Sequence, residues 1–373
     1  MPRIGVGLHM GTSPPLSRVH AMARFGRLLG AHSLWTVDHY TGWFPQDIWN
    51  KDFTWLAGGD DSADAYYDWQ VLLGHMAGRT GRAQLAVGVT EPIRRHPVTI
   101  AQAALTLSHM TKKPPIIGVG AGEAENIEPY GLSFAKPVAR VSEALEVIRL
   151  CLESRGPVDY AGEFFRLDQA IMDIAPGPGG MPEIWVAAHG PRMLELTGLH
   201  GDGWIPTLPM APGDYAASLA AIRTAAAGAG RDPEAIVPSF QVFLVVGPTA
   251  KAARRYLNHP AIRFMALLTP DSYWEAAGIT HPLGKGFRGM IDFVPARYSR
   301  GEIQAAIDAV PVEVMAAQTV WGTPADVVRQ LRELGEAGLR HVVLAPVSAL
   351  VSRRALAFTI ASLPGMSRKL RAG

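Results

Sequence analysis

The stretch PPIIGVGAGE, residues 114–123, decides how the rest of the chain is interpreted. An apolar run typical of a buried strand leads into three alternating glycines and ends on a carboxylate, Glu123. Glycine lets the backbone approach a flat or phosphorylated ligand closely, and such a turn leaves N–H groups free to bind it. We therefore expect residues 118–123 to form one wall of a ligand pocket, with Glu123 directed into it. A helix-entry turn with a solvated Glu123 is the alternative that the motif leaves open.

Short apolar runs alternate with helical patterns along the whole chain, which predicts a parallel sheet with crossover helices. The predicted strands cover residues 4–8, 33–37, 83–89, 115–120, 182–187, 203–205, 240–246 and 341–345. The helices predicted between them include 16–29, 97–110, 141–153, 214–227 and 324–337. Eight such units favour a closed TIM (β/α)8 barrel over an open doubly wound sheet, which usually has fewer strands and a glycine triad on its first βα turn.

The chain has 373 residues, of which 48% are hydrophobic, so it can bury one large core. Because α/β barrels of this size commonly fold as one unit, residues 1–373 are predicted to be a single domain. Two segments, about 40–65 and 258–320, are too long to be simple connections. Insertions of this length commonly act as lids over a site.

Charge and cysteine content narrow the classes of partner and compartment. The 35 basic and 33 acidic residues are spread along the chain, which argues against nucleic-acid binding. Cys151 is the only cysteine, so intramolecular disulfides are excluded and a reducing, cytoplasmic compartment is expected. No run approaches the roughly 18 apolar residues of a transmembrane segment, and the start of the chain does not resemble a signal peptide. Since no metal-binding motif or nucleophile elbow is present, we expect neither a metal site nor serine-hydrolase chemistry.

Asp38 and His39 directly follow the second predicted strand, so both should emerge at the rim where a barrel holds its acids and bases. Histidine exchanges a proton near neutral pH beside a reacting carbonyl or alcohol, and Asp38 is a candidate to orient it. The alternative is a capping Asp beside a structural His. Trp43, in the first insertion, belongs either to an aromatic wall over a substrate or to the packing of that insertion on the barrel.

Two other strand ends carry polar groups. Residues 88–92, GVTEP, precede Arg94 and Arg95, for which a solvated basic loop is favoured over an anion site. Residues 187–190, AAHG, open a helix and leave N–H groups where a phosphate binds, unless the loop holds no ligand.

Taken in order, four groups of residues resemble the luciferase-like (bacterial luciferase superfamily) oxidoreductases over nearly the whole chain. They are 36–39 with Trp43, 88–92 with 95–97, 118–123, and 184–191. Within that family, three longer runs resemble the branch that uses the deazaflavin coenzyme F420, and most of all the mycobacterial phthiodiolone dimycocerosate ketoreductases. These runs are EPYG at 128–131, KPVAR at 136–140 and WVAAHGPRM at 185–193.

The resemblance implies a TIM barrel with the deazaflavin in its C-terminal mouth and a non-prolyl cis peptide between Gly88 and Val89. The cofactor contacts that it implies are Asp38, Gly88, Val89, Thr90, Gly120, Ala121, Gly122, Glu123, Ala188, His189 and Gly190. His39, Trp43 and Glu123 match the catalytic positions of related sugar-phosphate dehydrogenases. Residues 207–210, TLPM, depart from the phosphate-binding lysine of those enzymes, which favours an apolar substrate.

The resulting hypothesis is hydride transfer between C5 of the deazaflavin and the carbonyl carbon of a lipid or polyketide-like ketone. His39 would protonate the alkoxide and Glu123 would manage the proton near the ring, or the two roles would be exchanged, while Trp43 flanks the reacting carbon. The alternative is a monooxygenase of the same fold that uses reduced FMN and oxygen. A non-catalytic member that binds a flavin-like ligand or a partner chain is a third possibility. Family analogy also implies a homodimer.

Overall fold

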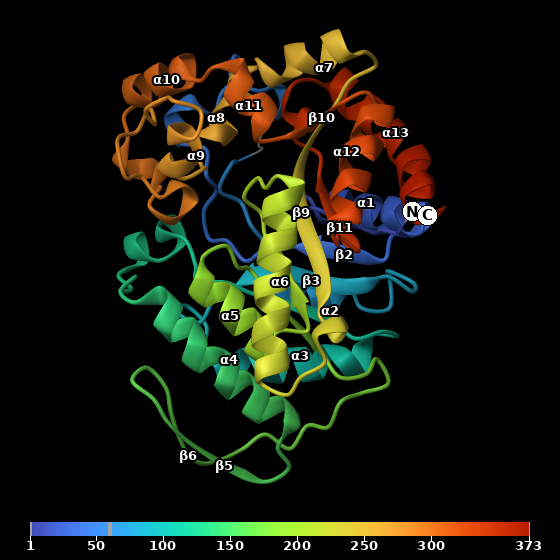
Figure 1. Cartoon of the computed structure of the whole chain (residues 1–373), viewed down its shortest axis with the longest axis vertical. Helices are drawn as coiled ribbons and strands as arrows, with labels where there is room; N and C mark the ends of the chain where they lie inside the picture. Colours follow the sequence, from blue (N-terminus) through green and yellow to red (C-terminus); the bar gives the residue numbers. More distant parts are fainter. Residues whose placement is uncertain (1, 59–61, 373) are drawn as a thin grey trace.

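The computed structural model describes residues 2–58 and 62–372, and its centre is a closed barrel of parallel strands (Figure 1). In order around the barrel the strands are β1 (Gly5–His9), β2 (Ser33–Thr36), β3 (Gln84–Thr90), β4 (Ile116–Val119), β7 (Glu183–Val186), β8 (Gly203–Trp204), β9 (Val237–Val246) and β11 (His341–Ala345). Each neighbouring pair is parallel, and the pairing of β8 with β9 closes the ring. All of these strands overlap predicted ones, which confirms the TIM (β/α)8 barrel.

Helices connect the strands and cover the outside of the barrel. They are α1 (Leu16–Leu29), α2 (Trp69–Met76), α3 (Pro97–Met110), α4 (Pro137–Glu153), α5 (Pro191–His200), α6 (Pro212–Gly228), α12 (Pro324–Glu336) and α13 (Arg353–Ala372). Several begin at a proline, whose fixed φ suits the first helical position, and Thr323 and Asp326 form a capping box at the start of α12. The predicted helices all correspond to members of this set. None of the helices in the described part of the chain is both long and apolar enough to cross a membrane.

The second predicted insertion, 258–320, is largely helical. After β9 the chain forms α7 (Ala250–Leu257), α8 (Pro260–Ala266), α9 (Asp271–Glu275), α10 (Arg300–Ala309), α11 (Val312–Ala317) and β10 (Val320–Gly322), and β10 pairs with the end of β9. Figure 1 shows these helices gathered where β9 ends.

The two insertions pack against each other. Phe44 and Phe53 of the first insertion lie with ring centroids 4.9 and 6.4 Å from that of Phe264 in α8, and Trp49 joins the same cluster. Residues 59–61 of the first predicted insertion lie outside the described residues. The two insertions therefore share one aromatic core at the carboxyl end of the barrel.

An antiparallel hairpin, β5 (Pro157–Ala161) and β6 (Arg166–Ile171), was not predicted. Its strands are mostly exposed, so they lack the apolar run that marks a buried strand. Figure 1 shows the hairpin projecting beyond α4, at the end of the molecule opposite to the inserted helices.

Aromatic side chains fill the interior of the barrel beneath the strand ends. The rings of Trp35 and Trp185 lie 5.5 Å apart and pack with Ile116 and Val343. A Cβ at Gly88 would lie 2.8 Å from the Trp35 ring, so a glycine is required where β3 passes this floor. The packed floor leaves the carboxyl ends of the strands as the place for a site.

Candidate active site

A cleft opens at the carboxyl ends of the barrel strands, with about 1050 Å³ of space between its walls when its open mouth is included. The candidate residues that line it are Asp38, His39, Trp43, Gly88, Val89, Gly120, Ala121, Gly122, Glu123 and His189. Three other candidates lie behind its surface or beside it. Thr90 and Ala188 are buried, while Gly190 is exposed and caps α5.

Residues 120–122, which follow β4 and are called the glycine wall below, line one part of the cleft and pack against β3. The peptide bond between Gly88 and Val89 is cis, as the resemblance implied. The Val89 side chain lies over β4, so that a Cβ at Gly120 would come within 2.8 Å of it. At Gly122, whose φ is +88°, a Cβ would lie 2.7 Å from Ile127. These glycines are therefore required by the packing of the wall as well as by any ligand that approaches it.

Asp38, the candidate to orient His39, is instead hydrogen-bonded to Arg94 and Arg95. Its carboxylate accepts from Arg95 at 2.7 and 2.9 Å and from the Thr90 hydroxyl at 2.7 Å, and its carbonyl accepts from Arg94 at 2.7 Å. Burial alone would raise the pKa of Asp38, but its bonds and charge pairing with Arg95 and Arg94 outweigh burial and lower it. Asp38 therefore ties β2 to the segment that follows β3.

The prediction of a solvated basic loop at Arg94 and Arg95 is wrong. Their side chains are only 2% and 15% exposed. Arg94 also pairs with Glu91 at 2.5 Å and lies 4.5 Å above the Tyr40 ring, while Arg95 pairs with Asp68 at 2.7 Å. Both arginines form ion pairs with the carboxylates around them, because a buried charge needs a partner of opposite sign.

His39 lies between the first insertion and the turn after β4. Its Nδ1 is 3.1 Å from the carbonyl of Thr41 and 3.2 Å from the amide nitrogen of Asn126, whereas its Nε2 is 3.6 Å from Glu123 Oε2. The same oxygen of Glu123 accepts from the Trp43 indole at 3.1 Å. His39, Trp43 and Glu123 thus form one connected group at the cleft.

The orientation of Asn126, which sequence reasoning missed, is fixed by the backbone of the first insertion. Its Oδ1 accepts from the N–H groups of Tyr40 and Thr41 at 2.6 and 3.2 Å. The amide nitrogen must then face His39 and Glu125, and it donates to Glu125 at 3.2 Å. Asn126 therefore connects the turn after β4 with the histidine.

Glu125 is completely buried beside this group, and its Oε2 has no hydrogen-bond partner among the described residues. Burial and the neighbouring Glu123 raise the pKa of Glu125 well above its ordinary value. His39, Glu123 and Glu125 offer ligand atoms within 4.8 Å of one another, a metal-like grouping not foreseen from the sequence. However, Trp43 already donates to Glu123 and Asn126 to Glu125, so hydrogen bonds occupy one oxygen of each carboxyl group.

His189 is a neutral hydrogen-bond acceptor. Its Nε2 accepts from the backbone N–H groups of Thr207 and Leu208 at 3.2 and 3.4 Å, and burial lowers its pKa to about 4. The proton of the neutral ring is then on Nδ1. His189 therefore holds the loop after β8 against the cleft without contributing a positive charge.

Other cleft residues escaped sequence reasoning, among them Gln241 in β9 and Arg288, Met290 and Ile291 in the second insertion. Gln241 is the one strongly polar side chain within the apolar run 240–246, which was an available signal, and its Oε1 lies 3.1 Å from His9 Nε2. The insertion residues had no comparable signal, because their approach to the cleft depends on tertiary packing.

A closed parallel barrel with a cleft of this construction under a helical insertion defines a TIM-barrel protein of the luciferase-like type. The model of the Luciferase-like monooxygenase family matches residues 1–341, and the chain belongs to this family. The resemblance stated from the sequence motifs is therefore confirmed.

Two relatives show the range of the family. The chain is 37% identical to the phthiodiolone/phenolphthiodiolone dimycocerosates ketoreductase of Mycobacterium tuberculosis (strain ATCC 25618 / H37Rv) over 340 residues, which cover 90% of this chain and 89% of that protein. It is 27% identical to the 5,10-methylenetetrahydromethanopterin reductase of Archaeoglobus fulgidus over 292 residues, covering 78% and 84%.

Solved structures share the fold. An F420-dependent secondary alcohol dehydrogenase in complex with an F420-acetone adduct aligns with a TM-score of 0.76 and 21% identity, with full coverage of both chains. The coenzyme F420-dependent tetrahydromethanopterin reductase of Methanopyrus kandleri aligns with a TM-score of 0.74 and 22% identity, covering 96% of this chain and 97% of that one.

Proposed function

We propose that the chain is a coenzyme F420-dependent oxidoreductase that reduces an apolar, lipid-like or polyketide-like ketone. The observation that carries this proposal is the grouping of His39, Glu123 and Trp43 in one cleft beside the glycine wall. The name of the 37% identical ketoreductase and the F420-dependent neighbours of the same fold support it.

The cleft suits a planar cofactor. Gly88, Val89 and the glycine wall carry little side-chain bulk, and the neutral His189 adds no charge to this part of the cleft. These residues, with Asp38 supporting them from β2, would hold the cofactor. When bound, F420 supplies or accepts the hydride. Thr90 would contribute indirectly, by donating a hydrogen bond to Asp38. Ala188 and Gly190 lie at the start of α5, whose free N–H groups suit an anionic part of the cofactor.

His39 is suited to proton exchange with the substrate. The Thr41 carbonyl accepts from Nδ1–H of a protonated ring, so Nε2 and its proton are directed to the cleft side, toward Glu123. A proton on Nε2 would pass to the oxygen of the ketone as its carbon gains the hydride. Trp43 would limit water at this point, and Glu123 would manage the proton on the cofactor side.

Glu125 extends this arrangement. Its Oε1 lies 3.9 Å from His39 Nδ1, and burial together with Glu123 holds its pKa well above the ordinary carboxyl value. A carboxyl group of raised pKa beside His39 would be suited to exchange a proton with it.

The main competing function is an FMN-dependent monooxygenase, which the family's own description favours. A long-chain alkane monooxygenase shares the fold with a TM-score of 0.67 and 17% identity. A non-catalytic, flavin-binding member is the third candidate. By analogy with its family, the chain is further proposed to be a cytoplasmic homodimer.

The test compares equilibrium binding of oxidised F420 and of FMN to the purified chain, followed by single-turnover oxidation of reduced F420 with long-chain ketones. We expect tighter binding of F420 and ketone-dependent turnover, which the variants His39→Ala and Glu123→Gln reduce. Glu234→Gln, an exposed glutamate remote from the cleft, is the matched control. Preference for FMN, or full hydride-transfer rates in both cleft variants, would refute the proposal.

A further inference from the structure

The barrel strands give the cleft a largely apolar floor, to which β9 adds an amide group. Val37, Ala187 and Ile205 directly follow β2, β7 and β8 and line the cleft with apolar side chains, and β3 contributes Gly88. The residue that β9 contributes is Gln241. Because an amide group in apolar surroundings needs hydrogen-bond partners, each of its two polar atoms is expected to have one.

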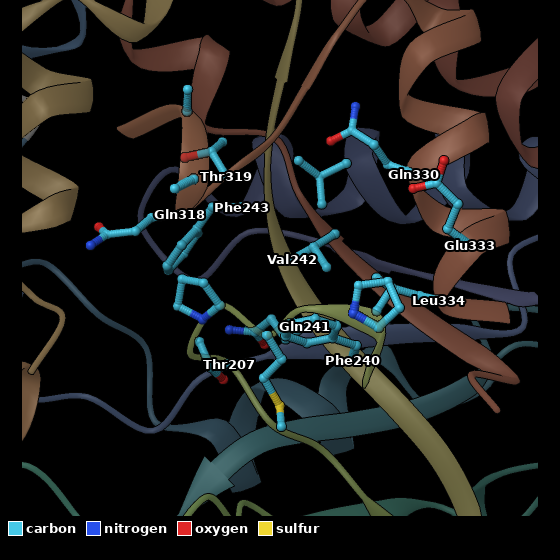
Figure 2. A pocket seen from close by; sticks show the side chains of 16 residues that line it. Thr207, Phe240, Gln241, Val242, Phe243, Gln318, Thr319, Gln330, Glu333 and Leu334 are labelled. Atoms are coloured by element: carbon cyan, nitrogen blue, oxygen red, sulfur yellow. The ribbon is translucent and has the colours of Figure 1, made fainter. Parts of the chain in front are cut away.

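The amide of Gln241 is oriented by His9, at the end of β1. Gln241 Oε1 lies 3.1 Å from His9 Nε2, and since an amide oxygen can only accept, the histidine nitrogen donates. Gln241 Nε2, on the other branch of the planar amide, is then left for another partner. Figure 2 shows the amide of Gln241 directed from β9 toward Thr207, on the same side of the strand as Phe243.

This nitrogen has open space in front of it. No acceptor in the described part of the chain lies within hydrogen-bond distance of Gln241 Nε2, and it is not one of the enclosed polar atoms that lack a partner. Gln241 borders both the cleft and a neighbouring cavity of about 660 Å³. In contrast, Gln330, across that cavity in Figure 2, already donates to the carbonyls of Trp321 and Asp326 at 2.7 and 3.1 Å. Gln241 therefore offers the cleft a donor that the protein itself does not use.

The free donor lies next to the surface that suits a planar cofactor. In the ring of barrel strands β9 lies opposite β3, and the Gln241 side chain reaches across the floor, so that its Oε1 is 3.8 Å from the place of a Cβ on Gly88. A flat ring resting against Gly88, Val89 and the glycine wall would bring one of its edges to the amide.

We propose that Gln241 donates a hydrogen bond to a carbonyl oxygen on the edge of a flavin-type ring and so fixes which edge of the ring enters the barrel. F420 and FMN share a pyrimidine edge with two carbonyl oxygens, which accept hydrogen bonds and cannot donate them. A ring turned end for end would leave both this donor and the carbonyl oxygens without their partner. The inference rests on the proposed function only for the presence of such a ring, not for the choice between the two cofactors.

The first test is equilibrium binding of oxidised F420 and of FMN to the wild type and to Gln241→Met, which has similar length and no donor. We expect the dissociation constant of the cofactor that binds to rise about tenfold in the variant. Gln102→Met, which makes the same change on the exposed face of α3, should leave it unchanged. Unchanged affinity for both cofactors in Gln241→Met would overturn the proposal.

The second test separates a direct bond from an effect through His9, which loses its acceptor in Gln241→Met. In 2-thio-FMN and 4-thio-FMN, sulfur, a weak acceptor, replaces one carbonyl oxygen. The wild type should bind one of these analogues several-fold more weakly than FMN, and Gln241→Met should discriminate less between that analogue and FMN. Equal discrimination by the two proteins would show that the amide acts only on packing and would refute the proposal.

Failure of the proposed function gives a different result. A wild type that prefers FMN to F420 would refute the F420 assignment, whereas weaker FMN binding in Gln241→Met would still support the bond from Gln241. A wild type that binds neither cofactor would overturn both.

Discussion

Replacing Asp38 with Asn tests whether the carboxylate at the end of β2 holds the cleft together. The substitution keeps the shape of the side chain and removes its charge. The side chains of Asp38 and Arg94 are each 2% exposed and that of Arg95 is 15% exposed, so solvent screens these pairs little. The variant leaves two largely buried cations short of one partner.

The expected decrease in the free energy of unfolding depends on the ion pairs that Arg94 and Arg95 keep. Removing one member of a buried pair typically costs about 3–5 kcal/mol. Arg94 keeps Glu91 and Arg95 keeps Asp68, which is 40% exposed, so we expect a reduction in the free energy of unfolding at the lower end, about 2–4 kcal/mol. The lowered pKa of Asp38 adds a pH signature. Because the pKa of Asp38 is lower in the folded state, its ionised form stabilises the protein at pH values above the ordinary carboxyl pKa of 3.8. This stabilisation is lost as pH falls through the folded-state pKa.

Urea unfolding at pH 7 and at decreasing pH measures both effects, with the exposed Asp168→Asn on β6 as the matched control. The difference between the wild type and Asp38→Asn should be largest at neutral pH and shrink in acid below about pH 4. A difference under about 0.5 kcal/mol at pH 7, the range of ordinary surface substitutions, would show that the ion-pair cluster is not what stabilises this end of the barrel.

Three other substitutions test parts of the site. Because the folded-state pKa of Glu125 is raised, ionisation of this buried group destabilises the wild type as pH rises, so Glu125→Gln should gain stability over the wild type in alkaline but not acidic urea titrations; an equal difference at all pH values would contradict the raised pKa of Glu125. Gly120→Ala places a Cβ 2.8 Å from Val89 and should weaken F420 binding about tenfold in fluorescence titrations, and unchanged affinity would exclude this wall as the cofactor surface. His39→Ala should slow single-turnover ketone reduction by about 10²–10⁴-fold with F420 affinity retained, whereas a parallel loss of affinity would make His39 a binding residue.

The sequence predicted the barrel well because βα repetition is a local pattern. Most buried strands are largely apolar runs, as at 240–246 apart from Gln241, and such runs are visible without knowledge of tertiary contacts. The hairpin β5–β6 escaped because its strands are exposed and partly charged. The helices α8 to α11 were not predicted, because residues 258–320 were recognised only as an insertion and not resolved into elements.

The site was predictable to the extent that strand ends converge. Parallel strands bring His39 and Glu123 to the same edge of the barrel although they are far apart in sequence. In contrast, the burial of Arg94 and Arg95 depends on Asp38, 56 and 57 residues away, and a basic pair in a loop does not reveal such a partner.

His189 links the two halves of the proposed binding region. Its ring lines the proposed cofactor cleft, and its Nε2 accepts from the N–H groups of Thr207 and Leu208 in the loop after β8, which also lines the cleft. A shift of the ring when one ligand binds would displace the loop that meets the other ligand. The affinities for the two ligands are then thermodynamically linked, and by reciprocity each ligand changes the affinity of the other by the same factor. Selection for a new substrate in the 207–210 loop would therefore also act on how tightly this barrel holds its cofactor.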